Sequence, residues 1–278
     1  MKKFIIIVVI FLFVCEKNPV NKDYSYLKFI IYSYLNAKDE PLNNLYIAAI
    51  LKDEEEYFPV YDTKIKISIN DSIIIEQKIT FSIYKKIKID YKFSPATTYN
   101  IKLTADDSLF SYIDVYIPEN TNFTAKKTNN AILFNWLPKN KICGYIIRGY
   151  FYDTKQNITV PIKKYTIINE NSDYIDYTES ELTGIITDTF YTMPYSIIEN
   201  FKKIYYSRQY GIEIDSVNQI VFYLYSLTEP TLKYLTVDKF SDNIFSAKIF
   251  NFDYMNLEGD LKGFIGGIAK DTLIYKIK

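Results

Sequence analysis

Histidine is absent from this sequence of 278 residues, cysteine occurs only twice, and tryptophan occurs once. Without imidazole, a Ser-His-Asp triad, a Cys-His pair and a histidine-ligated zinc site are excluded. Acid–base catalysis would have to use carboxylates, lysine or tyrosine. We therefore expect no cofactor and no metal, and the leading hypothesis is a function other than catalysis.

Arginine is also scarce, because it occurs only at Arg148 and Arg208, whereas acidic and basic residues balance at 33 each. Few side chains are thus available for bidentate recognition of phosphate or carboxylate. A chain without net charge offers little electrostatic attraction to nucleic acid. We expect no nucleic-acid partner.

One long apolar run is present, from Phe4 to Val14, and it follows two lysines and ends at Cys15. A helix needs about 20 apolar residues to span a bilayer, so this run is too short. A basic start, a short apolar core and a processing site are typical of a secretory signal. Residues 12–15, Leu-Phe-Val-Cys, resemble the bacterial lipoprotein box, although a small residue is usual in place of Val14.

The sequence therefore predicts a signal peptide over residues 1–14 and a lipid on Cys15, followed by a polar tether over residues 15–23. The alternative is an ordinary signal peptide in which this cysteine falls by chance. Cys143 would be left alone, so no intramolecular disulfide is expected. We expect Cys143 to be a small buried side chain, with a reactive thiol as the alternative.

Apolar and polar residues alternate with a period of two through much of the chain, which is typical of strands with one buried face. The cleanest runs are residues 64–69, 86–93, 99–104 and 112–117. Asn70-Asp71 suits a tight hairpin turn. Short strands at intervals of about ten residues predict an antiparallel sandwich or barrel.

Pro118 ends the first series of strands, and the polar, turn-rich residues 119–130 follow it. We predict a mainly β fold, with an immunoglobulin-like β-sandwich over residues 24–118 and a second, larger β-sandwich-like domain over residues 119–278. One or two short helices are expected in the second domain. Its expected elements are strands over 132–136, 145–152, 159–168, 185–192, 210–215 and 219–225, helices over 197–206 and 229–240, and a final strand over 271–277.

Residues 93–105 resemble the corner between late strands of a fibronectin type III or immunoglobulin-like sandwich. In such corners a tyrosine hydroxyl bonds to the backbone a few residues upstream, and the resemblance gives this role to Tyr99. Ala96 stands where glycine is usual. The run from residue 132 to Trp136, with 144–147 after it, is similar to the early strands of the same fold. Trp136 would then lie in the core, and a ligand cleft is the alternative.

Residues 256–267 hold four of the eight glycines and resemble the C-terminal ending of a family of Gram-negative surface lipoproteins of unknown function. Asp260 and Lys262 replace glycines that are usual there. Members combine a lipoprotein box, an immunoglobulin-like domain and a second β-rich domain, and they are common beside TonB-dependent outer-membrane transporters. The resemblance thus implies a lipid-anchored protein of the outer membrane. From the glycines alone, we expect a tight loop packing the final strand, with a ligand-binding loop as the alternative.

Two further features suggest chemistry. The acidic runs 53–56 and 106–107 offer oxygen ligands for Ca²⁺, but they lack the spacing of a calcium loop, so solvated loops are expected. The 28 tyrosines suit either amphipathic strands or a surface that stacks on sugar rings.

We expect a non-enzymatic, membrane-anchored surface lipoprotein that acts as a binding or accessory module. Its expected partners are the membrane, through the lipid, an outer-membrane transporter, and a carbohydrate or peptide ligand. The alternatives are a carbohydrate-active enzyme that uses paired carboxylates, and an adhesin or structural surface protein.

Overall fold

The computed structural model describes residues 27–37, 43–51, 61–81, 85–153, 158–170, 175–207, 219–237 and 254–277. Strands dominate these residues, and two short helices, α1 (Ser196–Ser207) and α2 (Glu229–Val237), interrupt them. The predicted fold class, mainly β with two β-sandwich units and one or two short helices, is confirmed. The signal peptide, the tether and Cys15 lie outside the described residues. Within the described part of the chain, neither helix is long and apolar enough to cross a membrane.

The first unit is a sandwich of two sheets around a core of isoleucine, leucine and phenylalanine. One sheet contains, in order, β16 (Glu258–Gly259), β7 (Leu109–Ile117), β6 (Thr97–Ala105), β3 (Tyr61–Ile69) and β4 (Ser72–Phe81). The facing layer contains β1 (Leu27–Leu35), β2 (Asn44–Leu51), β5 (Lys85–Lys88) and the start of β17 (Lys262–Lys276).

The second unit packs two sheets around a separate apolar core that also receives α1. Its smaller sheet contains β14 (Phe190–Pro194), β9 (Ala131–Asn135) and β8 (Thr124–Lys127). The other layer contains β11 (Ile158–Pro161), β10 (Ile142–Asp153), β15 (Gln219–Thr228) and the end of β17. The hairpin of β12 (Lys164–Glu170) and β13 (Ile175–Ser180) lies beside α1.

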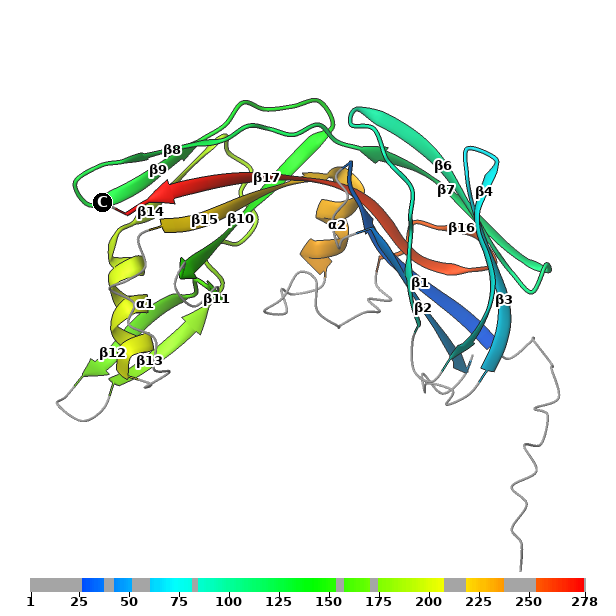
Figure 1. Cartoon of the computed structure of the whole chain (residues 1–278), viewed down its shortest axis with the longest axis horizontal. Helices are drawn as coiled ribbons and strands as arrows, with labels where there is room; N and C mark the ends of the chain where they lie inside the picture. Colours follow the sequence, from blue (N-terminus) through cyan, green and yellow to red (C-terminus); the bar gives the residue numbers. More distant parts are fainter. Residues whose placement is uncertain are drawn as a thin grey trace, which may run out of the picture.

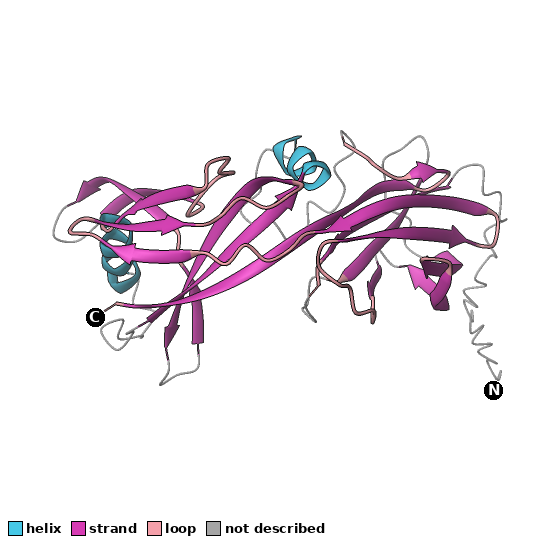
Figure 2. Cartoon of the chain, turned by 90° about the horizontal axis from the view of Figure 1, so that it is seen from above, coloured by secondary structure: helices cyan, strands magenta, loops and turns pink. Residues whose placement is uncertain are grey.

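The last strand, β17, belongs to both units. Its residues 262–267 pair in parallel with β1, and residues 268–276 pair antiparallel with β15. One seven-stranded sheet therefore runs through both units, which lie end to end, with α2 beneath the middle of β17 (Figures 1 and 2). The predicted boundary after Pro118 remains a prediction, but residues 258–267 form part of the first unit's sheets.

The period-two prediction is confirmed in β6 and β7, where buried and more exposed residues alternate. Asn70 and Asp71 form the turn between β3 and β4 with φ angles of 48° and 66°, as a tight hairpin requires.

Four expectations need correction. Cys143 is exposed, because a bulge between Ile142 and Gly144 removes it from the ladder with β15. The strand expected over 185–192 begins only at Phe190, since Ile186 makes a single isolated bridge to Tyr145. The strand expected over 159–168 is divided between β11 and β12. The residues expected to form a glycine-rich loop are mostly strand, because β17 begins at Lys262 rather than near residue 271. The strand expected over 210–215 lies outside the described residues.

Gly267 lies where β17 changes partner from β1 to β15, and it packs directly on β7. A Cβ at this position would overlap the carbonyl oxygen of Tyr116. The backbone of β17 can approach β7 so closely only because Gly267 has no side chain.

We predict that Gly267→Ala lowers the free energy of unfolding by about 3 kcal/mol, because neither backbone can yield without breaking ladder hydrogen bonds. The matched control is Gly184→Ala, where a Cβ would meet no atom within 4 Å; we expect a change below about 0.5 kcal/mol. Urea denaturation of the two variants measures the difference, and equal midpoints would contradict this account of β17.

Candidate functional site

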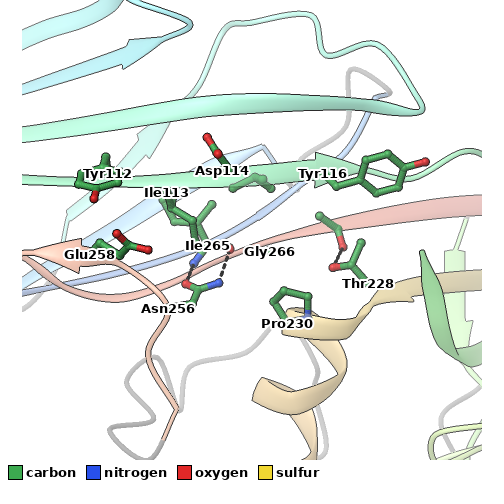
Figure 3. A pocket seen from close by; sticks show the side chains of 12 residues that line it. Tyr112, Ile113, Asp114, Tyr116, Thr228, Pro230, Asn256, Glu258, Ile265 and Gly266 are labelled. Atoms are coloured by element: carbon green, nitrogen blue, oxygen red, sulfur yellow. Dashed lines mark hydrogen bonds between the residues drawn. The ribbon is translucent and has the colours of Figure 1, made fainter. Parts of the chain in front are cut away.

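A pocket of about 340 Å³ lies where β7, β17 and the start of α2 meet (Figure 3). One wall is formed by consecutive β7 residues, 112–116, and another by β17 residues 265–267. The remaining lining residues are Thr228, Pro230, Asn256 and Glu258. The pocket thus lies at the junction of the two units, on positions held by sheet hydrogen bonds.

The β7 wall presents Tyr112, Asp114 and Tyr116 on its outer face, because their odd-numbered neighbours are buried in the first core. The Asn100 side-chain amide donates a hydrogen bond of 2.8 Å to the Asp114 carboxylate. The Lys141 ammonium lies 4.4 Å from the centre of the Tyr116 ring. Glu258 raises the pKa of Tyr112 above its ordinary value, through side-chain hydrogen bonding and through its negative charge.

Polar side chains on the opposite wall bond to backbone. The Asn256 side chain accepts a hydrogen bond of 3.0 Å from the Ile265 N–H and donates one of 2.9 Å to the Ile265 carbonyl. The Thr228 hydroxyl donates to the Gly267 carbonyl at 3.1 Å. These bonds fix the wall, and they leave few free side-chain groups on it for a ligand.

Tyr99 and Trp136, which the sequence singled out, lie away from this pocket, whereas the glycine-rich segment 256–267 contributes five of its lining residues. Tyr99 is buried in the first core, and its hydroxyl accepts a hydrogen bond of 2.7 Å from the Ser94 N–H, five residues upstream. Ala96, where glycine is usual, has a φ of 55°. Trp136 is 5% exposed, lies in the second core, and has its ring 5.1 Å from that of Tyr145.

The acidic run 53–56 lies outside the described residues. Asp106 and Asp107 form the turn after β6, where the Asp106 carboxylate accepts a hydrogen bond from the Lys64 N–H at 2.9 Å. Across the described ranges, no group of three or more cysteine or acidic side chains is arranged to hold a metal ion.

The structure also shows a charged cluster that the sequence did not reveal. The Glu181 carboxylate forms ion pairs with both Arg148 and Lys163, and the three side chains are 10–17% exposed. The members are far apart in the sequence and no motif links them, so only the tertiary structure brings them together. The cluster ties β10 to the segments on either side of the β12–β13 hairpin, which is a structural role.

Comparison with known proteins gives no family. No family model matches the chain, and no curated protein matches it. Among solved structures, the chicken CNTN1 FN1–FN3 domains are 11% identical, with 88% of this chain and 65% of that chain covered and a TM-score of 0.27. The central fibronectin-III array of RIM-binding protein is 9% identical, with 91% and 87% covered and a TM-score of 0.19. The chain thus spans less than two thirds of the CNTN1 fragment, and likenesses this distant say nothing about activity or partners.

The contact between Tyr112 and Glu258 generates a prediction about titration. Because the hydrogen bond and the charge both come from Glu258, Glu258→Gln is expected to move the pKa of Tyr112 down towards its ordinary value. Asp114→Asn is the matched control and should have a smaller effect, since Asp114 is the weakest of the causes. NMR titration of the protein labelled with ¹³C-tyrosine measures both, with Tyr112→Phe to assign the signal. An unchanged Tyr112 pKa in Glu258→Gln would show that the pair is absent in solution.

Proposed function

We propose that this chain is a lipid-anchored protein of the bacterial outer membrane that acts as a non-enzymatic binding or accessory module. The lysine-rich start, the short apolar run and Cys15 support the anchor. The resemblance of residues 256–267 to the ending of a family of Gram-negative surface lipoproteins supports the outer membrane and suggests a TonB-dependent transporter as partner.

The pocket between β7 and β17 is the observation that carries the binding role. Sites for ligands are typically concave, largely pre-formed and located at junctions between units. Here the walls are strands, and the polar side chains already hold their hydrogen bonds, so binding would cost little conformational entropy.

An apolar surface continues from the pocket along β7. Phe110 is 42% exposed and Tyr112 is 40% exposed, and their ring centres are 5.9 Å apart. Exposed aromatic pairs of this kind are common at the centres of protein interfaces. The pocket and this pair therefore form one surface on which a partner would dock.

The carbohydrate-active enzyme is the second candidate, because the pocket contains two carboxylates, Asp114 and Glu258. Turnover of a polysaccharide that was lost in Asp114→Asn or Glu258→Gln, while binding remained, would establish it in place of the binding module.

The two cysteines allow a clean test of the anchor. In cells grown with a fatty-acid analogue, we expect the wild type and Cys143→Ser to take up label equally, because Cys143 is an exposed cysteine within β10 and not a processing site. Cys15→Ser should take up none. Label in Cys15→Ser, or none in the wild type, would refute lipid attachment at this residue.

The docking surface is tested by capture of partners from detergent-solubilised outer membranes. We expect the full chain to recover an outer-membrane protein, and the double variant Phe110→Ser, Tyr112→Ser to lose at least about tenfold of it, since each aromatic anchor contributes about 1 kcal/mol or more. Ile73→Ser is the control, because Ile73 is 57% exposed on β4 at the opposite end of the same sheet. Recovery of no partner, or equal recovery by all three proteins, would count against this surface.

A further inference from the structure

The outer edge of β7 is only partly paired. β16 pairs with it at two positions, Glu258 with Tyr112 and Gly259 with Ser111. β7 continues to Ile117, yet among the described residues no strand pairs with this edge beyond Tyr112. The unpaired stretch forms the β7 wall of the pocket.

The register shows which backbone groups face the pocket. In an antiparallel strand, alternate residues direct both N–H and C=O to the same edge. The Phe110 carbonyl accepts a hydrogen bond of 2.8 Å from the Asp260 N–H, so even-numbered residues of β7 face the β16 side. The Tyr116 carbonyl, which lies against Gly267, has the same orientation. Asp114, midway between them, therefore directs its N–H and C=O into the pocket.

Within the described ranges, the chain leaves this edge open. Continuing β16 backwards along β7 would place Asn256 opposite Asp114. Instead, the Asn256 N–H donates to the Gly263 carbonyl at 2.9 Å, and its side chain bonds to Ile265. Leu257 is buried in the first core. Residues 256–257 are therefore bonded to β17, and they do not occupy the ladder position opposite Asp114.

The chemistry of the pocket favours a ligand that bonds through its main chain. The side chains of Asn256 and Thr228 are engaged with backbone. A sugar would need such side-chain groups for its hydroxyls. The Asp114 N–H and C=O instead have the spacing of a strand ladder, which an extended peptide complements.

Side chains around the vacant position select for positive charge. A residue added opposite Asp114 would place its side chain on the outer face, beside the Asp114 carboxylate and between Tyr112 and Tyr116. The lining residues include two carboxylates and neither lysine nor arginine. Lysine or arginine would pair with Asp114 and lay its alkyl stem along the Tyr112 ring, since Lys141 already lies over the Tyr116 ring.

We propose that β7 binds an extended segment of a partner protein as an added antiparallel strand, which continues the line of β16 and places a lysine or arginine opposite Asp114. This inference rests on the proposed binding function and names its ligand class. The five-stranded sheet of the first unit would then gain one short strand, which would lie inside the pocket.

The test uses the full mature chain and a blocked peptide of alternating valine and lysine, with binding measured by calorimetry. Asp114→Pro removes the outward N–H and is tolerated on an edge strand, so affinity should fall about tenfold. Asp114→Asn keeps the N–H and removes the charge, so affinity should fall about threefold and lose much of its salt dependence. The same peptide N-methylated at alternate residues, and a valine–glutamate peptide, should not bind.

Because Asp114→Pro also alters the fold locally, hydrogen exchange in the wild type gives an independent measurement. The Asp114 amide should exchange at least about tenfold more slowly in the presence of the peptide, since a ladder bond must open first. Unchanged exchange, or equal binding of the N-methylated peptide, would overturn strand addition. If the peptide does not bind while capture of partners still depends on Phe110 and Tyr112, only strand addition is refuted. If the full chain also captures no partner, the proposed function is refuted as well.

Discussion

Backbone hydrogen bonding along both edges of β17 is the interaction on which the rest of the structure depends. The strand has 15 residues, which at about 3.3 Å per residue makes it about 50 Å long. Residues 262–267 pair with β1 in the first unit, and residues 268–276 pair with β15 in the second unit. Moving one unit against the other would break this ladder. The buried Asp271 side chain reinforces it by accepting the Thr121 N–H, and Thr121 in turn bonds to Ser226 at 2.7 Å.

A third core fills the angle between the two sandwiches beneath β17. It gathers tyrosines from β1 and β15 around Phe264 and Ile268 and is closed by α2. The Tyr234 ring of α2 stacks on Phe264 with centres 4.2 Å apart and planes at 16°. Burial is the largest cause that raises the pKa of Tyr32 in this cluster well above its ordinary value. Part of the tyrosine excess in the sequence is therefore structural, because these rings pack the junction rather than form an outer surface.

Local patterns predicted the strands well, and long-range contacts account for what they missed. Tyr99, Ile101 and Leu103 lie on one face of a single strand, so local alternation in the sequence was enough to predict that they are buried. In β17, Gly263, Gly266 and Gly267 interrupt the apolar pattern, and their clustering suggested a loop. Gly267 is instead required by the approach of β17 to β7, a contact between residues about 150 positions apart.

Sequence analysis reached only part of the candidate site. The ligand-binding alternative for residues 256–267 falls on five lining residues, but the juxtaposition of this segment with β7 depends on long-range contacts. Asp114 and Tyr116 look like ordinary outward residues of a strand, and Asn256 looks like part of a loop. Only the hydrogen bonds show that Asn256 is bonded to β17 and so leaves Asp114 without a ladder neighbour in the part of the chain that the structure describes. The signal that was available was the alternation of β7, which placed Tyr112, Asp114 and Tyr116 on one exposed face.

Among the described residues, the two ends of the first unit's five-stranded sheet are protected in different ways. Unpaired strand edges promote aggregation, and proteins commonly protect them with charges and bulges. β4, at one end, has both devices. Glu76 pairs with Lys64 at 2.7 Å, Lys78 pairs with Asp62 at 3.1 Å, and the register shifts at Ile67.

β7, at the other end, is protected by its surroundings instead. β16 pairs with its edge as far as Tyr112, and Gly267 of β17 packs against the Tyr116 carbonyl. The stretch of β7 backbone left unpaired among the described residues is therefore short and lies within a pocket. A flat sheet edge from another molecule cannot enter such a recess, whereas a single extended chain can. The geometry that ties the two units together through β17 therefore also limits what can pair with β7.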